Sequence, residues 1–309
     1  MERDWKKESK RDFLLLSDYT PDEIRALLDI AARLKDERRR GIPHPLLQGK
    51  TLGMIFEKSS TRTRVSFEAG MIQLGGSALF LSKHELQIGR GEPVEDTARV
   101  LSRYLDGIMI RTFEQEKVET LARFSSIPVI NGLTDFAHPC QVIADLLTIR
   151  ERKGGLEGRA LCYIGDGNNM ANSLIVGGIK TGMAVRVACP AAYRPDAGIM
   201  AWARENGDFL CTQDVRAAAA GADVLYTDVW ASMGQEDEAE ARREIFAGYQ
   251  INAAALEAAA PGAMVLHCLP AHRGEEITAQ VMEAHADEIF DEAENRLHAH
   301  KAILVYLMA

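Results

Sequence analysis

The sequence is organised around the stretch Phe56-Glu57-Lys58-Ser59-Ser60-Thr61-Arg62-Thr63-Arg64. It follows an apolar run at residues 51–56, which is typical of a buried strand, and it precedes a helical pattern that ends at Gly75-Gly76. A helix N-terminus carries a partial positive charge and can bind a phosphate. The hydroxyls of the stretch add hydrogen-bond donors, and Arg62 adds a planar guanidinium that matches phosphate oxygens. The stretch predicts a phosphate site, although an ordinary Ser/Thr helix cap followed by a solvated basic turn has the same pattern.

The composition limits the class of protein. With 309 residues the chain is long enough for two domains, and its net charge of -9 argues against a nucleic-acid surface. No apolar run is long enough to span a membrane, and residues 1–10 lack the apolar core of a signal peptide. Five cysteines without CxxC spacing argue against a disulfide framework or a zinc site. We therefore expect a cytoplasmic protein that binds neither nucleic acid nor membrane and holds no metal or cofactor.

Strand and helix patterns alternate along the whole chain, which predicts an α/β fold with parallel sheets covered on both faces. Charges and glycines at residues 151–155 interrupt the alternation. We place the domain boundary there, which gives two doubly wound domains at residues 1–150 and 151–291, followed by a helix from about residue 292 to 309.

Other polar residues follow apolar strands in the first half. Arg111 ends a strand at residues 107–112, and ligands of open parallel sheets bind at the carboxyl ends of strands. It can share an anionic ligand with Arg62, or form a salt bridge with a nearby glutamate. His138 and Gln141, three residues apart at the start of a helix, share one face and can both point at a ligand.

The second half carries a glycine-rich turn and two further strand ends. Gly165-x-Gly167 is a weak dinucleotide motif, because Met170 occupies the position of the third glycine. Asp228 follows a buried strand on the expected ligand side. His267 and Cys268 are adjacent on a strand and point to opposite faces, which argues against a Cys–His nucleophilic pair.

Five motifs in this order resemble those of the aspartate and ornithine carbamoyltransferase family. They are Ser-Thr-Arg-Thr-Arg at residues 60–64, the polar loop at 82–91, His-Pro-x-Gln at 138–141, Asp-x-x-x-Ser-Met-Gly at 228–234 and His-Cys-Leu-Pro at 267–270. The fourth motif is typical of the ornithine-using branch. The resemblance covers essentially the whole chain, and it implies that the C-terminal helix returns to the first domain.

The resemblance also implies an activity and a set of site residues. The carbamoyl group of carbamoyl phosphate would pass to the δ-amine of L-ornithine, in arginine biosynthesis, within a homotrimer or a multiple of trimers whose subunits share active sites. The implied catalytic residues are Arg111, His138 and Cys268. The implied carbamoyl-phosphate site comprises Ser60, Thr61, Arg62, Thr63, Gln87, Arg111, His138, Gln141, Cys268, Leu269 and Arg296. The implied ornithine site comprises Asn169, Asp228, Ser232 and Met233.

The residue types suit this chemistry. Attack of a neutral amine on the carbonyl carbon needs positioned positive donors, and neither a metal nor a covalent nucleophile. Asp228 and Cys268 are alternative proton acceptors for the amine. Two other functions stay open: a carbamoyltransferase for another amine, such as putrescine or an acylated ornithine, and a nucleotide-binding oxidoreductase.

Overall fold

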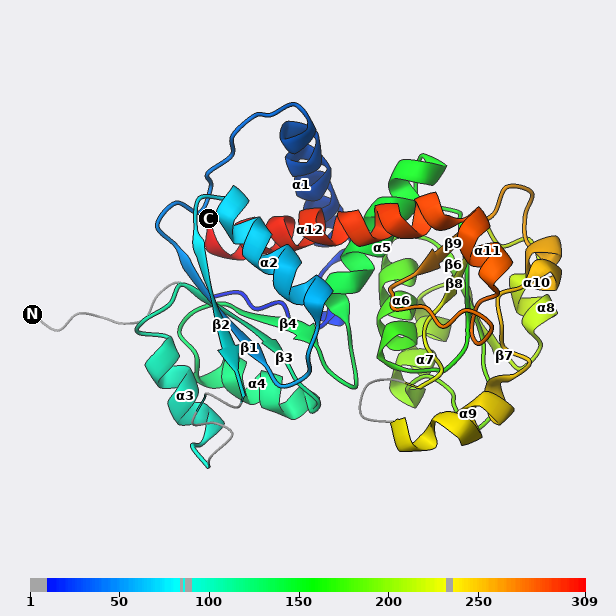
Figure 1. The fold of residues 1–309 in the computed structure, drawn as a ribbon. Coiled ribbons are helices and arrows are strands. Elements are labelled where there is room, and N and C mark those ends of the chain that lie inside the picture. Colours follow the sequence, from blue (N-terminus) through cyan, green and yellow to red (C-terminus); the bar gives the residue numbers. More distant parts are fainter. Residues whose placement is uncertain (1–9, 84–85, 87–90, 232–235) are drawn as a thin grey trace, which may run out of the picture. The chain divides into compact units, whose positions relative to one another are not determined.

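The computed structural model describes residues 10–83, 86, 91–231 and 236–309. These residues divide into two compact units (Figure 1). The first unit comprises the described residues up to Asp18, together with Asp29–Cys140 and Leu297–Ala309. The second comprises Tyr19–Leu28 and Gln141–Arg296. In the described part of the chain, no helix is both long and apolar enough to cross a lipid bilayer.

The first unit is built on a parallel sheet whose strand order is β2-β1-β3-β4 in the described residues. The strands are β1 (Thr51–Phe56), β2 (Ser77–Ser82), β3 (Gly107–Arg111) and β4 (Val129–Leu133). The central strand β3 is buried along its whole length, whereas the edge strand β2 is largely half-exposed. This gradient is expected for a parallel sheet that helices cover on both faces.

The helices of the first unit lie on opposite faces of this sheet (Figure 1). They are α2 (Thr61–Gln73), α3 (Val94–Leu101) and α4 (Gln115–Phe124), with a short 3₁₀ helix at Leu16–Asp18. Ala98 of α3 and Val118 of α4 pack on β3 residues such as Ile108 in one apolar cluster. Helix α3 ends at Leu101, and the next residue, Ser102, donates its hydroxyl to the carbonyl of Ala98.

The C-terminal part of α12 (Ala286–Met308) belongs to the first unit, which confirms the predicted return of the chain. Its His300 stacks on Phe67 of α2 with ring centroids 3.9 Å apart, and His300 Nδ1 lies 2.8 Å from the Ser66 hydroxyl. Nearby, Lys301 Nζ is 3.1 Å from His44 Nε2. The backbone of α2 can approach this helix closely because Gly70 faces Lys301.

The second unit is built on a parallel sheet of order β7-β6-β5-β8-β9 in the described residues. Its strands are β5 (Ala160–Ile164), β6 (Ala184–Ala188), β7 (Phe209–Thr212), β8 (Val224–Thr227) and β9 (Met264–His267). Its helices are α6 (Asn169–Lys180), α7 (Ala197–Asn206), α8 (Val215–Ala219), α9 (Ala239–Phe246), α10 (Ala253–Ala258) and α11 (Ala279–Ala284), with a 3₁₀ helix at Glu236–Glu238. Helices α1 (Pro21–Arg39) and α5 (Pro139–Lys153), like α12, carry residues of both units.

Each sheet contains a point where the strand order reverses. In the first unit the chain passes from β1 to β2 on one side and from β3 to β4 on the other; in the second it passes from β5 to β7 on one side and from β8 to β9 on the other. Open α/β sheets bind ligands beside such a switch point, at the carboxyl ends of the strands. The fold therefore predicts ligand-binding residues in the segments after β1 and β3, and in those after β5 and β8.

Candidate active site

The loop after β1 joins Arg111 in a hydrogen-bonded chain at the first switch point. Ser60 is the N-cap of α2: its hydroxyl oxygen accepts the Thr63 backbone N–H at 3.2 Å, and its O–H donates to Thr63 Oγ1 at 3.0 Å. Arg111 ends β3 and donates to the same Thr63 oxygen at 3.4 Å. Both Thr63 and Arg111 are buried. The structure thus brings a guanidinium, hydroxyls and a helix N-terminus together, which suits an anionic ligand.

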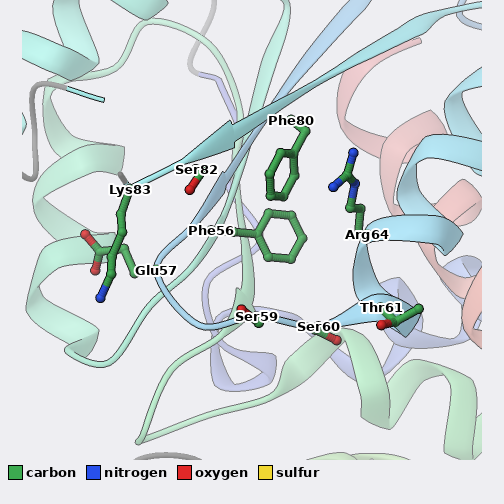
Figure 2. Close-up of a pocket in the computed structure, with 9 residues that line it drawn as sticks. All are labelled: Phe56, Glu57, Ser59, Ser60, Thr61, Arg64, Phe80, Ser82 and Lys83. Carbon is green, nitrogen blue, oxygen red and sulfur yellow. The ribbon is translucent and has the colours of Figure 1, made fainter. Parts of the chain in front are cut away.

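A pocket of about 240 Å³ opens beside the same loop (Figure 2). Its lining residues are Phe56, Glu57, Ser59, Ser60, Thr61, Arg64, Phe80, Ser82 and Lys83. The Arg64 guanidinium lies over the Phe80 ring, 3.8 Å from its centroid, and contacts Glu68. Ser60 and Thr61 belong to this wall, while the half-buried Arg62 and the buried Thr63 do not.

His138 and Gln141 flank the first turn of α5. His138 is buried and directly precedes Pro139, the first residue of the helix. Gln141, in the second unit, is also fully buried, and its side-chain oxygen accepts a hydrogen bond from Arg296 of α12. Two of the predicted site residues, Gln141 and Arg296, are therefore in direct contact.

Asp228 lies at the second switch point, directly after β8. Its Oδ2 accepts from Asn168 Nδ2 at 3.0 Å, and its Oδ1 accepts from the Val229 backbone at 2.8 Å and from Cys268 Sγ at 3.1 Å. Asn168 is the N-cap of α6, and Asn169 is the first residue of that helix. The carboxylate is buried and held by neutral donors, so a cationic ligand group would supply its charge partner.

The Cys268 thiol is a hydrogen-bond donor in this arrangement. Burial raises the pKa of Cys268 well above its usual range, and the nearby Asp228 carboxylate raises it further. A neutral thiol that donates to Asp228 cannot take up a proton, because a thiolate would first have to form next to a carboxylate. Of the two candidate proton acceptors, this geometry argues against Cys268.

This difference predicts selective alkylation. Cys211 is half-exposed with its sulfur 3.8 Å from Cys189 Sγ, and the hydrogen bond from Cys189 lowers the pKa of Cys211. At pH 7.5 iodoacetamide should label Cys211 at least about tenfold faster than Cys268, because the thiolate is the nucleophile. Buried Cys162, whose pKa burial raises to about 12, is the matched slow control. Peptide mass spectrometry over time measures the rates, and equal labelling of Cys211 and Cys268 would contradict this description.

Both ring nitrogens of His267 have partners within the protein. Its Nε2 faces Glu276 at 2.9 Å, and its Nδ1 accepts the Leu269 backbone N–H at 2.9 Å. The Leu269–Pro270 bond is cis, and Leu269 has a φ of 58°. One ligand atom each of Asp228, His267 and Cys268 lies within 4.8 Å of the others. Both ring nitrogens of His267 are engaged, which argues against metal ligation by this group.

Three predicted site residues lie outside the described residues: Gln87, Ser232 and Met233. Asn168, the first of two consecutive asparagines in the sequence, contacts Asp228. Conversely, the sequence did not single out Asp145 and Glu292, which both contact Gln141. The available signal was helical spacing: Gln141 and Asp145 are four residues apart, as are Glu292 and Arg296.

The fold and these residues define a doubly wound α/β protein with polar side chains at the switch point of each sheet. Two family models match the chain: "Aspartate/ornithine carbamoyltransferase, carbamoyl-P binding domain" over residues 11–151, and "Aspartate/ornithine carbamoyltransferase, Asp/Orn binding domain" over residues 157–307. The chain belongs to the aspartate/ornithine carbamoyltransferase family.

Individual relatives agree with the family models. An ornithine carbamoyltransferase of Oceanobacillus iheyensis is 57% identical over 97% of this chain and 94% of the relative. One of Syntrophotalea carbinolica is 58% identical over 97% of this chain and 100% of the relative. The solved structure of ornithine carbamoyltransferase from Pyrococcus furiosus is 52% identical, with a TM-score of 0.93 over 97% of both chains.

Proposed function

We propose that this protein is an ornithine carbamoyltransferase, which transfers the carbamoyl group of carbamoyl phosphate to the δ-amine of L-ornithine and forms L-citrulline and phosphate. The observation that carries the proposal is the hydrogen-bonded chain of Ser60, Thr63 and Arg111 at the first switch point. The names of the relatives support the choice of ornithine as the second substrate.

In this proposal the first switch point binds the phosphate and stabilises the transition state. Arg111 and Thr63, with His138, polarise the carbonyl oxygen as the amine attacks, and the same loop holds the departing phosphate. Donors fixed before the reaction stabilise the developing charge without reorganisation. The phosphate-binding set is Ser60, Thr61, Arg62, Thr63 and Arg111. Gln141 accepts a hydrogen bond from the carbamoyl amine, and Gln87, Cys268, Leu269 and Arg296 complete the carbamoyl-phosphate site.

The second switch point recognises the amino-acid end of ornithine. Asp228 pairs with the α-ammonium group, while Asn169, Ser232 and Met233 bind the rest of the amino-acid end. Cys268 already donates to Asp228, so the thiol is not the acceptor of the δ-amine proton. Residues 1–150 with 292–309 form the carbamoyl-phosphate domain and residues 151–291 the ornithine domain. The reaction needs no cofactor, and it takes place in the cytoplasm as a step of arginine biosynthesis.

The direct test is citrulline formation from carbamoyl phosphate with ornithine, putrescine and an acylated ornithine as alternative amines. Ornithine should be the preferred substrate. Carbamoyl phosphate, and not NAD, should raise the melting temperature, because a ligand of the folded state stabilises it by mass action. Absence of citrulline from the folded protein would reject the proposal, and stabilisation by NAD would favour the oxidoreductase alternative.

We further propose a homotrimer, or a multiple of trimers, in which Gln87 completes the active site of a neighbouring subunit. Gln87→Ala and Arg111→Ala proteins should each be nearly inactive. Random mixing of equal amounts should restore about one quarter of the sites, because a site is intact where an Arg111-bearing subunit meets a Gln87-bearing neighbour. Activity after dissociation and reassembly measures this. Mixed oligomers, verified by mass spectrometry, that stay inactive would exclude the shared site.

A further inference from the structure

A buried group of polar residues surrounds Gln141 in the second unit. Gln141 and Asp145 lie on α5, and Glu292 and Arg296 lie on α12. The two carboxyl side chains and Gln141 are fully buried, and Arg296 is nearly so. Neither carboxyl group belongs to the proposed substrate-binding set, and burial of two acids at one position is costly unless it has a compensating arrangement.

The contacts fix the orientation of the Gln141 amide. Its Nε2 donates to Asp145 Oδ1 at 2.8 Å and to Glu292 Oε1 at 3.1 Å, while Arg296 donates to its Oε1. An amide carries donors on nitrogen and acceptors on oxygen, and a guanidinium has donors only. If the amide were reversed, its nitrogen would face Arg296 and its oxygen would face the carboxyl oxygens. In the observed orientation the amide nitrogen donates to two carboxyl oxygens and the amide oxygen accepts from the guanidinium.

The two carboxyl groups have different roles in this arrangement. Glu292 accepts from the Tyr226 hydroxyl at 3.1 Å and from the His267 backbone N–H at 2.8 Å, in addition to Gln141. By contrast, Asp145 Oδ1 accepts from Gln141, and its buried Oδ2 has no hydrogen-bond partner among the described residues. Two neighbouring buried carboxyl groups also disfavour a second negative charge. Burial and the Glu292 charge raise the pKa of Asp145 well above its usual range. The proton therefore belongs on Asp145, and Glu292 is the ionised acceptor.

We propose that Asp145 and Glu292 are positioning residues that hold the Gln141 side-chain oxygen toward the substrate, so that the site selects an acyl phosphate bearing an N–H donor. The inference rests on the proposed function, because Gln141 binds the carbamoyl amine there. Acetyl phosphate has the same phosphate and carbonyl groups, but a methyl group replaces the amine. The carboxyl pair thus controls discrimination between carbamoyl and acetyl phosphate without touching either.

Because Asp145 and Glu292 differ in protonation, amide substitutions at the two positions should have different effects. In Asp145→Asn the new amide is neutral and can still accept from Gln141, as the protonated acid does. In Glu292→Gln one accepting oxygen becomes an NH₂ group and faces donors that previously met a carboxylate. Glu288→Gln is the matched control: Glu288 lies one turn earlier on α12 and accepts the Val265 backbone N–H of β9 at 2.9 Å. Like Glu292, Glu288 is a carboxylate of α12 that accepts a backbone N–H of β9, but it does not belong to the group around Gln141.

The experiment measures the KM for carbamoyl phosphate and the inhibition constant of acetyl phosphate, with melting temperature as the check of folding. Asp145→Ala and Glu292→Gln should raise the KM for carbamoyl phosphate roughly 5- to 100-fold, the range for one unsatisfied buried polar group, and leave acetyl phosphate inhibition unchanged. Asp145→Asn and Glu288→Gln should stay within about threefold of the unaltered protein for both ligands. In a Gln141→Ala background, Asp145→Ala should have no further effect, because it acts through Gln141.

Several results would overturn the inference. Equal weakening of carbamoyl and acetyl phosphate would indicate general damage to the site, and multiplicative losses with Gln141→Ala would show that Asp145 acts independently. If Asp145→Ala fails to fold, the comparison of Asp145→Asn with Glu292→Gln decides, since equal losses in these two contradict the assigned proton. A protein that forms no citrulline overturns the proposed function and this inference together; one that forms citrulline without the predicted asymmetry overturns the inference alone.

Discussion

Replacing Arg111 with Ala is expected to lower kcat/KM for citrulline formation by about 10²- to 10³-fold, the effect of removing one fixed donor to a developing negative charge. Arg111 ends the central strand β3, is buried, and donates a hydrogen bond to Thr63 at the start of α2. A buried guanidinium in this position can stabilise both the carbonyl oxygen and the departing phosphate. The loss should therefore affect kcat as well as KM.

Two further variants make the result specific. Arg111→Lys keeps the charge and loses the planar fork, so it should retain an intermediate activity. Arg40→Ala removes an exposed arginine that pairs with Asp36 on α1, and should leave kinetics unchanged. Steady-state kinetics with a melting temperature for each variant separates lost catalysis from lost folding. A folded Arg111→Ala protein within tenfold of normal activity would reject a role for Arg111 in catalysis.

The fold was predictable because its signals are local. Apolar runs such as residues 51–56 and 107–111 form fully or nearly fully buried strands, and the polar residues that follow them lie at the ligand edge of each sheet. Prediction of the strands did not require knowledge of their order. The reversals of order beside β1 and β5, which locate both candidate sites, came from the structure.

The polar environment of Gln141 was not predictable, because it depends on long-range packing. Glu292 is 151 residues from Gln141 along the chain, and neither spacing nor composition indicates that they touch. Burial of Asp145 was equally hidden, since an aspartate on a helix is usually solvated. Helical spacing placed Asp145 beside Gln141, but only the packing of α12 on α5 showed that the acid would be buried near a second carboxyl group.

The specificity for ornithine should depend most on Asp228. Ornithine and putrescine present the same reacting amine on similar carbon chains, and they differ at the far end, where ornithine has a carboxylate and an ammonium group. Asp228 is fixed by Asn168, Val229 and Cys268, all neutral donors, with its charge in a buried position. A buried site made for a charged group discriminates strongly against a ligand that lacks it, by roughly 10⁴-fold in kcat/KM.

Asp228→Asn should therefore reduce kcat/KM for ornithine far more than for putrescine, so that most of the roughly 10⁴-fold preference is lost. The amide has no charge for the α-ammonium group, and its NH₂ must face one of the donors that now point at the carboxylate. Turnover with ornithine should fall as well as affinity, because binding energy at the far end of the substrate also helps to reach the transition state. Asp223→Asn is the matched control, since Asp223 directly precedes β8 at the opposite end of the strand and contacts Arg159 and the Ala160 backbone. It should change stability without changing the ratio of the two amines. Steady-state kinetics of all three proteins with both amines decides the matter: an Asp228→Asn enzyme that keeps the full preference for ornithine would show that recognition of the ammonium group lies elsewhere.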